Sequence, residues 1–221
     1  MVVYTVSPQT CIAKAHSKTI FHSTINMFDE IFEFEQDLAQ FAGAPYAVMT
    51  DSCTHAIELC LRYDAVTQCK FTAYTYISVP QTMVKLGIEY ELTDETWLGE
   101  YQFHGTRVWD SARRLEPNMY RPGQMQCLSF GFSKPIDVNR GGAILLDDAT
   151  AWQVMSQMRS DGRDLHVSPW QQQTVMPMGF HYRPTREEAS RAHVALTQYQ
   201  QCPQPPQLVN YPDCRKIFIR T

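Results

Sequence analysis

The chain has 221 residues, of which 44% are hydrophobic and 19% are charged, and its net charge is −4. This length suits one sizeable core or two small domains, and the apolar content excludes a disordered chain. A pI near 6.0 argues against a general nucleic-acid-binding protein, which would carry a basic excess. No apolar run reaches the roughly 20 residues that span a bilayer, and the N-terminus lacks the pattern of a signal peptide, so we expect a cytoplasmic protein.

Seven cysteines are scattered along the sequence without a C-x-x-C pair. This distribution predicts neither a disulfide framework nor a metal site.

Strands and helices are expected to alternate through most of the chain. Asn26 can cap a first helix that runs to about Gln40 and ends at Gly43. The alternation predicts an α/β layered fold with a largely parallel sheet. Strands are predicted at 46–49, 71–72, 88–92, 106–109, 126–130 and 143–146, and further helices at 53–63, 77–86, 149–159 and 185–199.

The chain changes character after Tyr199. Residues 200–206 are rich in Pro and Gln, which is typical of a linker. The sequence therefore divides into an N-terminal segment (1–25), a folded domain (26–199) and a linker with a tail (200–221). We expect the tail to pack against its own domain or a partner subunit through its apolar residues, which are Val209, Tyr211, Ile217, Phe218 and Ile219.

A polar turn at Asp51–Thr54 joins a predicted strand to a predicted helix. Backbone N–H groups at a helix N-terminus form an anion site, and phosphate is a common ligand there. Plain capping of the helix by Ser52 accounts for the same residues equally well.

Two further residues are candidates for chemistry. Asp110 ends an apolar strand, where α/β sheets place ligand-binding groups, although a surface carboxylate or a helix cap also fits. Lys134 lies between a strand and Gly141-Gly142, and it is either a solvated lysine or an amine that forms a Schiff base. Pyridoxal phosphate needs a site that binds its phosphate, an acidic partner for its ring nitrogen and a lysine for its aldehyde. The sequence offers these in a typical order, which is a polar turn, a strand-end Asp, Ser-x-x-x-x-Lys and Gly-Gly.

Over about residues 31–199 the chain resembles the DegT/StrS family of pyridoxal phosphate-dependent sugar aminotransferases. Seven segments match family motifs in the same order. The resemblance implies the three-layer α/β/α large domain of the aspartate aminotransferase-like (type I) transferase fold, with a mostly parallel sheet. The matching segments are 34–43 (F-E-x-x-x-A-x-x-x-G), 47–59 (strand and S-G-T-x-A turn), 73–78 (P-x-x-T-F/Y), 108–112 (E-D-A-A-Q/H), 129–142 (S-F-x-x-x-K…G-G), 158–162 (R-x-H-G) and 179–183 (G-Y-N-Y-R).

The resemblance also implies roles for single residues. Lys134 would form the Schiff base with the cofactor and move protons, and Asp110 would keep the pyridine nitrogen protonated. His181 would reach the cofactor phosphate of a neighbouring subunit, which implies a homodimer with shared active sites. The other cofactor-binding residues would be Ser52, Cys53, Thr54 and Ser129 at the phosphate, Tyr76 on the ring face and Arg113 near the ring hydroxyl.

Five positions depart from the family pattern. Cys53 stands in place of Gly, which requires either an ordinary backbone conformation in the turn or a small shift of it. Arg113 stands in place of Gln or His, and its cation would stabilise a phenolate on the ring. Asn139-Arg140 replaces Gly-Glu/Asp, and His181 replaces Asn, which leaves a side chain that can still donate to phosphate.

The implied activity is transfer of an amino group, by family analogy from glutamate to a nucleotide-linked keto sugar. Relatives have a longer stretch between Ile88 and Trp109 and a C-terminal small domain, which we expect this chain to lack. An alternative function is a binding or interaction module of the same fold that has lost transamination together with that domain. A third is another reaction of the same cofactor, such as racemisation or decarboxylation.

Overall fold

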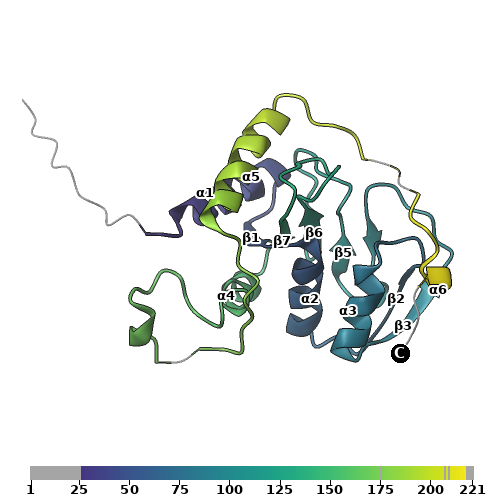
Figure 1. Ribbon diagram of the computed structural model, residues 1–221, viewed down its shortest axis with the longest axis horizontal. Helices are drawn as coiled ribbons and strands as arrows, with labels where there is room; N and C mark the ends of the chain where they lie inside the picture. Colours follow the sequence, from purple (N-terminus) through teal and green to yellow (C-terminus); the bar gives the residue numbers. More distant parts are fainter. Residues whose placement is uncertain (1–25, 175, 207, 209, 218–221) are drawn as a thin grey trace, which may run out of the picture.

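The computed structural model describes residues 26–174, 176–206, 208 and 210–217 (Figure 1). The predicted strands and helices are confirmed, with ends that shift by a few residues. Three short elements were not predicted: β4, the 3-10 helix η1 and α6. The elements are α1 (Asp29–Ala42), β1 (Tyr46–Thr50), α2 (Cys53–Tyr63), β2 (Gln68–Thr72), α3 (Ser78–Leu86), β3 (Glu89–Thr93), β4 (Tyr101–Gln102), β5 (Val108–Asp110), β6 (Met125–Ser129), β7 (Gly142–Leu146), α4 (Ala149–Met158), η1 (Trp170–Gln172), α5 (Arg186–Tyr199) and α6 (Cys214–Ile217).

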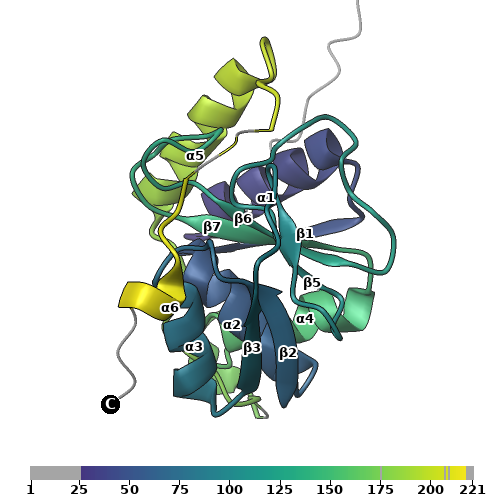
Figure 2. The same ribbon diagram turned by 90° about the vertical axis from the view of Figure 1, so that its right-hand side faces the viewer.

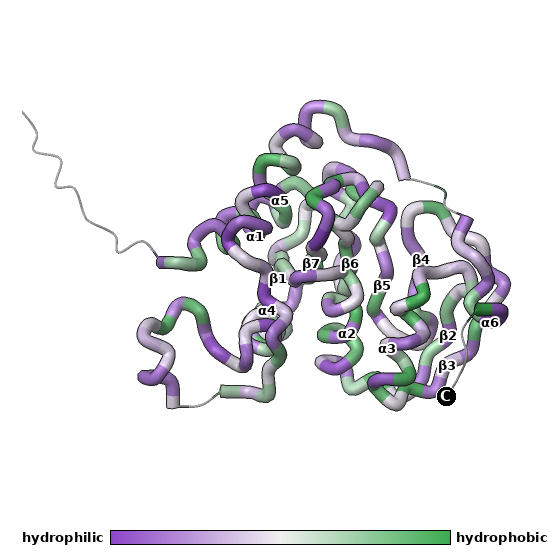
Figure 3. The backbone as a smooth tube through the Cα atoms, viewed as in Figure 1, coloured by the Kyte–Doolittle hydropathy of each residue, from purple (hydrophilic) through white to green (hydrophobic). Residues whose placement is uncertain are grey.

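The elements form three layers, with helices on both faces of the sheet (Figure 2). Side chains of successive strand residues point to opposite faces, so each strand supplies both cores. Ala47, Met49 and Leu145 are buried against α1 and α5, whereas Val48 and Ile144 are buried on the side of α2, α3 and α4. Hydrophobic residues recur along α2, which packs on β6 and β7 (Figure 3). The three-layer α/β/α fold expected from the sequence is therefore confirmed.

The strand directions correct one detail of the expected sheet. The order of strands in the main sheet is β1-β7-β6-β5-β4. A second, two-stranded sheet consists of the parallel pair β2 and β3. A single bridge between Lys70 and His104 connects β2 to the segment after β4. Five strands, β1, β2, β3, β5 and β6, run in one direction. The neighbouring pairs are nevertheless mixed, because β7 lies between β1 and β6 and is antiparallel to both. β7 follows β6 through a loop at 130–141 that contains no helix, so the chain turns back instead of crossing over.

The ends of α1 show which sequence signals control it. The predicted cap at Asn26 lies two residues too early: its side chain accepts a hydrogen bond from the N–H of Phe28, which is the actual N-cap residue. The predicted stop at Gly43 is confirmed, because this glycine adopts φ 72° and its N–H caps the last turn.

The segment between β3 and β5 was expected to be an almost direct link. It instead carries β4, an edge strand that pairs antiparallel with β5. Short strands of two residues leave almost no periodic pattern, so the sequence could not reveal this one.

The chain after α5 returns across the domain to the end where β2 and β3 lie (Figure 1), and the N–H of Cys214 in α6 donates to the carbonyl of Ala73, just after β2. Cys214 is completely buried there, which confirms that the tail packs on its own domain. Of the five apolar tail residues, Val209, Phe218 and Ile219 lie outside the described residues, and Ile217 is half exposed. None of the helices in the described part of the chain is long and apolar enough to cross a membrane.

Candidate active site

A pocket of about 460 Å³ lies where β1, β5 and β6 end and β7 begins. These ends meet because the three strands run in the same direction and β7 runs in the opposite one. The pocket brings together eight of the nine cofactor-binding residues predicted from the sequence. They are Ser52, Cys53, Thr54, Tyr76, Asp110, Arg113, Ser129 and Lys134.

The first wall of the pocket is the N-terminus of α2. Ser52 is the N-cap residue, with an extended backbone, and its hydroxyl accepts a hydrogen bond of 3.2 Å from the N–H of His55. The prediction that Ser52 caps this helix is therefore confirmed. The N–H groups of a helix's first turn have no acceptor within the helix, and the residues Ser52, Cys53 and Thr54 at the start of α2 line the pocket.

Cys53 fits the turn without the family's glycine. It is the first residue of α2, so its backbone is helical and any L-residue can adopt it. Its thiol lies 3.7 Å from the carbonyl oxygen of Cys127. Burial raises the pKa of the Cys53 thiol well above its usual value, and the nearby Asp110 carboxyl raises it further, so the side chain stays a neutral thiol at neutral pH.

The turn is held from behind by β7 and by the side chain of Asp51. Gly142 lies so close that an added Cβ would overlap the backbone nitrogen of Cys53 and come within 2.6 Å of the carbonyl carbon of Ser52. Asp51 contacts the His55 ring at 2.5 Å and Arg140 at 2.8 Å. Burial raises the pKa of Asp51, but these two partners outweigh it and the net pKa is lowered, which keeps the carboxylate ionised.

Asp110 forms the floor of the pocket, and its carboxyl is held in a fixed orientation. One oxygen accepts a bond of 3.0 Å from the N–H of Ala112, and the other accepts a bond of 2.9 Å from the hydroxyl of Tyr101. The Tyr101 hydroxyl also lies 2.6 Å from the hydroxyl of Thr75. Burial raises the pKa of Asp110, although these donors and the charge of Lys134 oppose the rise. A protonated ring nitrogen bound beside this carboxyl would favour its ionised form.

Lys134 lies on the loop between β6 and β7, and Arg113 lies on the segment that follows β5. The guanidinium of Arg113 donates to the backbone oxygen and, at 3.2 Å, to the hydroxyl of Ser133. Ser133 has φ 59°, and its N–H is bound by Asp137 at 2.8 Å. The amine of Lys134 lies 3.2 Å from the hydroxyl of Tyr211, a residue of the tail.

His181 does not lie at this pocket. It belongs to the arm between α4 and α5 (residues 160–185), where its side chain is 78% exposed and lies 3.2 Å from the carboxylate of Asp161. Its role at the phosphate of a partner subunit stays a prediction.

Thr75, Trp97 and Tyr211 line the pocket but received no role from the sequence, and neither did Tyr101, whose hydroxyl contacts Asp110. Thr75 lies within a predicted motif, whereas Trp97, Tyr101 and Tyr211 lie in segments that showed no periodic pattern. The only available signal was the density of aromatic residues between 97 and 103, which the burial of Tyr101 and Phe103 now explains.

Comparison with known proteins agrees with this geometry. Residues 9–95 match the model of the DegT/DnrJ/EryC1/StrS aminotransferase family. No curated protein matches the sequence.

Three solved structures illustrate the likeness of fold, and each alignment covers 78% of this chain. One is 3-amino-5-hydroxybenzoic acid synthase, at 20% identity, 56% of its own chain covered and a TM-score of 0.65. Another is PseC of Helicobacter pylori, an aminotransferase involved in pseudoaminic acid biosynthesis, at 15% identity, 58% covered and a TM-score of 0.63. The third is DesI in the presence of its TDP-sugar product, at 18% identity, 54% covered and a TM-score of 0.62.

These identities establish the fold, and the chain spans little more than half the length of the structures it matches. The family model covers the part that contains β1, the polar turn, α2 and α3. The motif residues beyond it, Asp110, Ser129 and Lys134, line the same pocket as that turn. The chain therefore has the type I fold of these aminotransferases, and over residues 9–95 it is similar to the DegT/DnrJ/EryC1/StrS aminotransferase family.

Proposed function

We propose that the pocket binds pyridoxal phosphate and that the protein is an aminotransferase. The observation that carries this proposal is the convergence of Lys134, Asp110 and the N-terminus of α2 on one pocket. Each meets a different need of the cofactor, because the aldehyde needs an amine, the ring nitrogen needs an acid and the phosphate needs N–H donors. The buried carboxyl of Asp110 suits the ring nitrogen of the cofactor, and the N-terminus of α2 suits its phosphate.

When bound, pyridoxal phosphate supplies an electron sink for the substrate carbon. The residues of the chain would orient it and move protons around it. The N–H groups of Cys53 and Thr54 and the hydroxyls of Ser52 and Ser129 would bind the phosphate. Tyr76, whose side chain is largely exposed at the pocket, would cover a face of the ring.

Two charged side chains would set the protonation of the bound ring. Asp110 would hold a proton at the pyridine nitrogen, because its carboxyl is fixed by Tyr101 and Ala112 and cannot turn away. Arg113 would stabilise negative charge on the ring oxygen. The amine of Lys134 would attach the cofactor covalently and carry a proton to and from the substrate carbon.

The substrates are assigned by likeness. We propose glutamate as amino donor and a nucleotide-linked keto sugar as acceptor. Support comes from DesI, which was solved with a TDP-sugar product, and from the role of PseC in the biosynthesis of pseudoaminic acid.

Covalent trapping tests the proposal. Incubation with pyridoxal phosphate followed by borohydride is expected to leave a pyridoxyl group on the peptide that contains Lys134, detected by mass spectrometry. Lys134→Ala is expected to abolish this adduct, whereas Lys70→Ala, which removes an exposed lysine paired with Glu91, should leave it unchanged. Absence of the adduct from the unaltered protein would refute cofactor attachment at this lysine.

A second stage separates the aminotransferase from a binding module. Addition of glutamate to the loaded protein is expected to release 2-oxoglutarate and leave the pyridoxamine form of the cofactor. An adduct at Lys134 without this half-reaction would favour the module, and loss of carbon dioxide or inversion of the amino acid would favour one of the other reactions.

We also propose a homodimer with shared sites. Support comes from the arm, which extends from the body (Figure 1) and carries His181 together with exposed apolar side chains, among them Trp170 and Met178. Light scattering is expected to give twice the mass of the chain. His181→Ala is expected to weaken cofactor binding roughly tenfold, the loss of one or two hydrogen bonds to an anion. A monomer that binds the cofactor as tightly as before would contradict the shared site.

A further inference from the structure

The tail is fastened to the domain on both sides of Tyr211. On the N-terminal side of Tyr211, the hydroxyl of Tyr199 accepts a hydrogen bond from the N–H of Gln204 and donates one to the carbonyl of Gln204, both at 3.0 Å. After it, the N–H of Cys214 donates to the carbonyl of Ala73 at 2.9 Å, and its thiol lies 3.3 Å from the carbonyl of Thr75. Because Cys214 is completely buried, this second attachment is part of the core.

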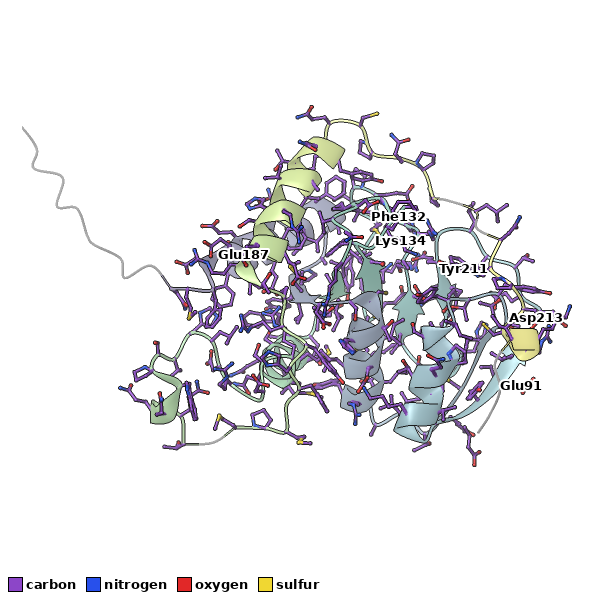
Figure 4. All side chains as sticks on the ribbon, viewed as in Figure 1. Glu91, Phe132, Lys134, Glu187, Tyr211 and Asp213 are labelled. Carbon is purple, nitrogen blue, oxygen red and sulfur yellow. The ribbon has the colours of Figure 1, made fainter. Side chains whose placement is uncertain are left out.

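Tyr211 lies between these attachments, and its side chain reaches the pocket. Its ring stacks on Trp97, with centroids 6.0 Å apart and an interplanar angle of 15°, and meets Tyr76 edge-on at 6.4 Å. The guanidinium of Arg113 lies 6.0 Å from the ring centroid. Phe132, Lys134 and Tyr211 line the same pocket, and Figure 4 labels all three in the region between the sheet and the returning tail.

The hydroxyl of Tyr211 lies 3.2 Å from the amine of Lys134. A phenol can accept from an ammonium group and donate to a neutral amine, so this contact can persist in both protonation states of the lysine. The ring is held by Trp97 and Tyr76, and the hydroxyl therefore occupies a fixed place rather than following the lysine.

We propose that the C-terminal tail forms a wall of the active site and that Tyr211 is a positioning residue for the amine of Lys134. The tail would thereby exclude water from one side of the pocket and restrict the rotamers of a long, flexible lysine. The contribution of Tyr211 to amino transfer rests on the proposed function. The location of Tyr211 beside Lys134 does not depend on that function.

The experiment measures the reactivity of single lysines in the cofactor-free chain. Reductive methylation with formaldehyde and cyanoborohydride is followed by mass spectrometry, with Lys70 as the internal standard. Tyr211→Ala is expected to raise the methylation rate of Lys134 at least fivefold, because both the ring and the hydrogen bond are lost. Tyr211→Phe, which keeps the ring, is expected to raise it about twofold.

Two more variants complete the design. Cys214→Ala loosens the second attachment and is expected to raise the rate at Lys134 without changing the rate at Lys70. Tyr46→Phe removes a hydroxyl from a ring that stacks on Trp152, in the first strand and outside the pocket, and should leave both rates unchanged. An unchanged rate in Tyr211→Ala would overturn the wall, and a rate in Tyr211→Phe equal to that of the unaltered chain would overturn the positioning role.

These outcomes are separable from those of the proposed function. A faster rate in Tyr211→Ala, together with no pyridoxyl adduct in the unaltered protein, would support the tail's position and refute cofactor binding. An adduct at Lys134, with no change in any methylation rate, would refute the role of the tail alone.

Discussion

Arg159→Met is expected to lower the free energy of unfolding by about 3–5 kcal/mol, the usual loss when a buried ion pair keeps one partner. The Arg159 side chain is 1% exposed, and its guanidinium pairs with Glu35 of α1, itself 8% exposed. The same group donates to the carbonyl of Met49 in β1, whose N–H donates to Glu35 at 2.6 Å. One arginine thus joins α1, β1 and the end of α4, and the variant leaves a carboxylate buried without its cation.

The pH dependence identifies this mechanism. Burial raises the pKa of Glu35 even with Arg159 present, and loss of the cation would raise it further. In the variant, the folded state would bind a proton that the unfolded state releases, so its stability falls as pH rises through and above the unfolded pKa. The difference from the unaltered protein should therefore shrink as pH falls towards the ordinary glutamate pKa of about 4.3 and be smallest below it, measured by urea unfolding at several pH values.

Two comparisons test the assignment. Adding Glu35→Gln to Arg159→Met should recover part of the loss, because the amide is neutral and offers both an acceptor and a donor to Met49. Arg163→Met removes an arginine whose partner Asp161 is 40% exposed, and it should change stability by less than about 1 kcal/mol. Equal effects of Arg159→Met and Arg163→Met would show that the buried pair has no special importance.

Gly142→Ala is expected to destabilise the protein by about 3 kcal/mol and to weaken cofactor binding at the same time. The added Cβ would lie 2.6 Å from the carbonyl carbon of Ser52 and 2.7 Å from the Cα of Cys53. These are backbone atoms at the start of α2, so no side chain can rotate to make room. Either β7 or the turn must move, and the turn is the proposed phosphate site.

A matched glycine controls for the loss of backbone freedom. Gly131 lies on the same loop side of the sheet, and a Cβ there would meet only the Ser129 hydroxyl, at the ordinary distance of 3.6 Å. Thermal unfolding of Gly131→Ala should differ from that of the unaltered protein by a degree or two at most, roughly the effect of about 0.5 kcal/mol. If Gly142→Ala unfolds at the same temperature as Gly131→Ala, the close approach of β7 to the turn does not constrain the fold.

The sequence determined the local structure and the order of the chemical groups. Helical periodicity identified α1, α2, α4 and α5, and short apolar runs identified β1, β3, β6 and β7, because core positions recur at fixed spacings in regular elements. Capping chemistry was less informative at the start of α1, where Asn26 binds the N–H of Phe28 and the helix begins later. Motif order was sufficient to place Lys134, Asp110 and the polar turn at one site.

The tertiary structure decided what fills the space around those groups. Sequence patterns report which faces of an element are apolar, but they carry no information on which distant segment covers a pocket. Tyr101 reaches Asp110 from a strand of two residues, and Tyr211 reaches Lys134 from a tail whose Pro and Gln content indicated only a linker. The antiparallel course of β7 was likewise set by the loop at 130–141, which contains the lysine and no helix. Contacts between segments far apart in the chain depend on the packing of the whole domain, so only the folded structure could reveal them.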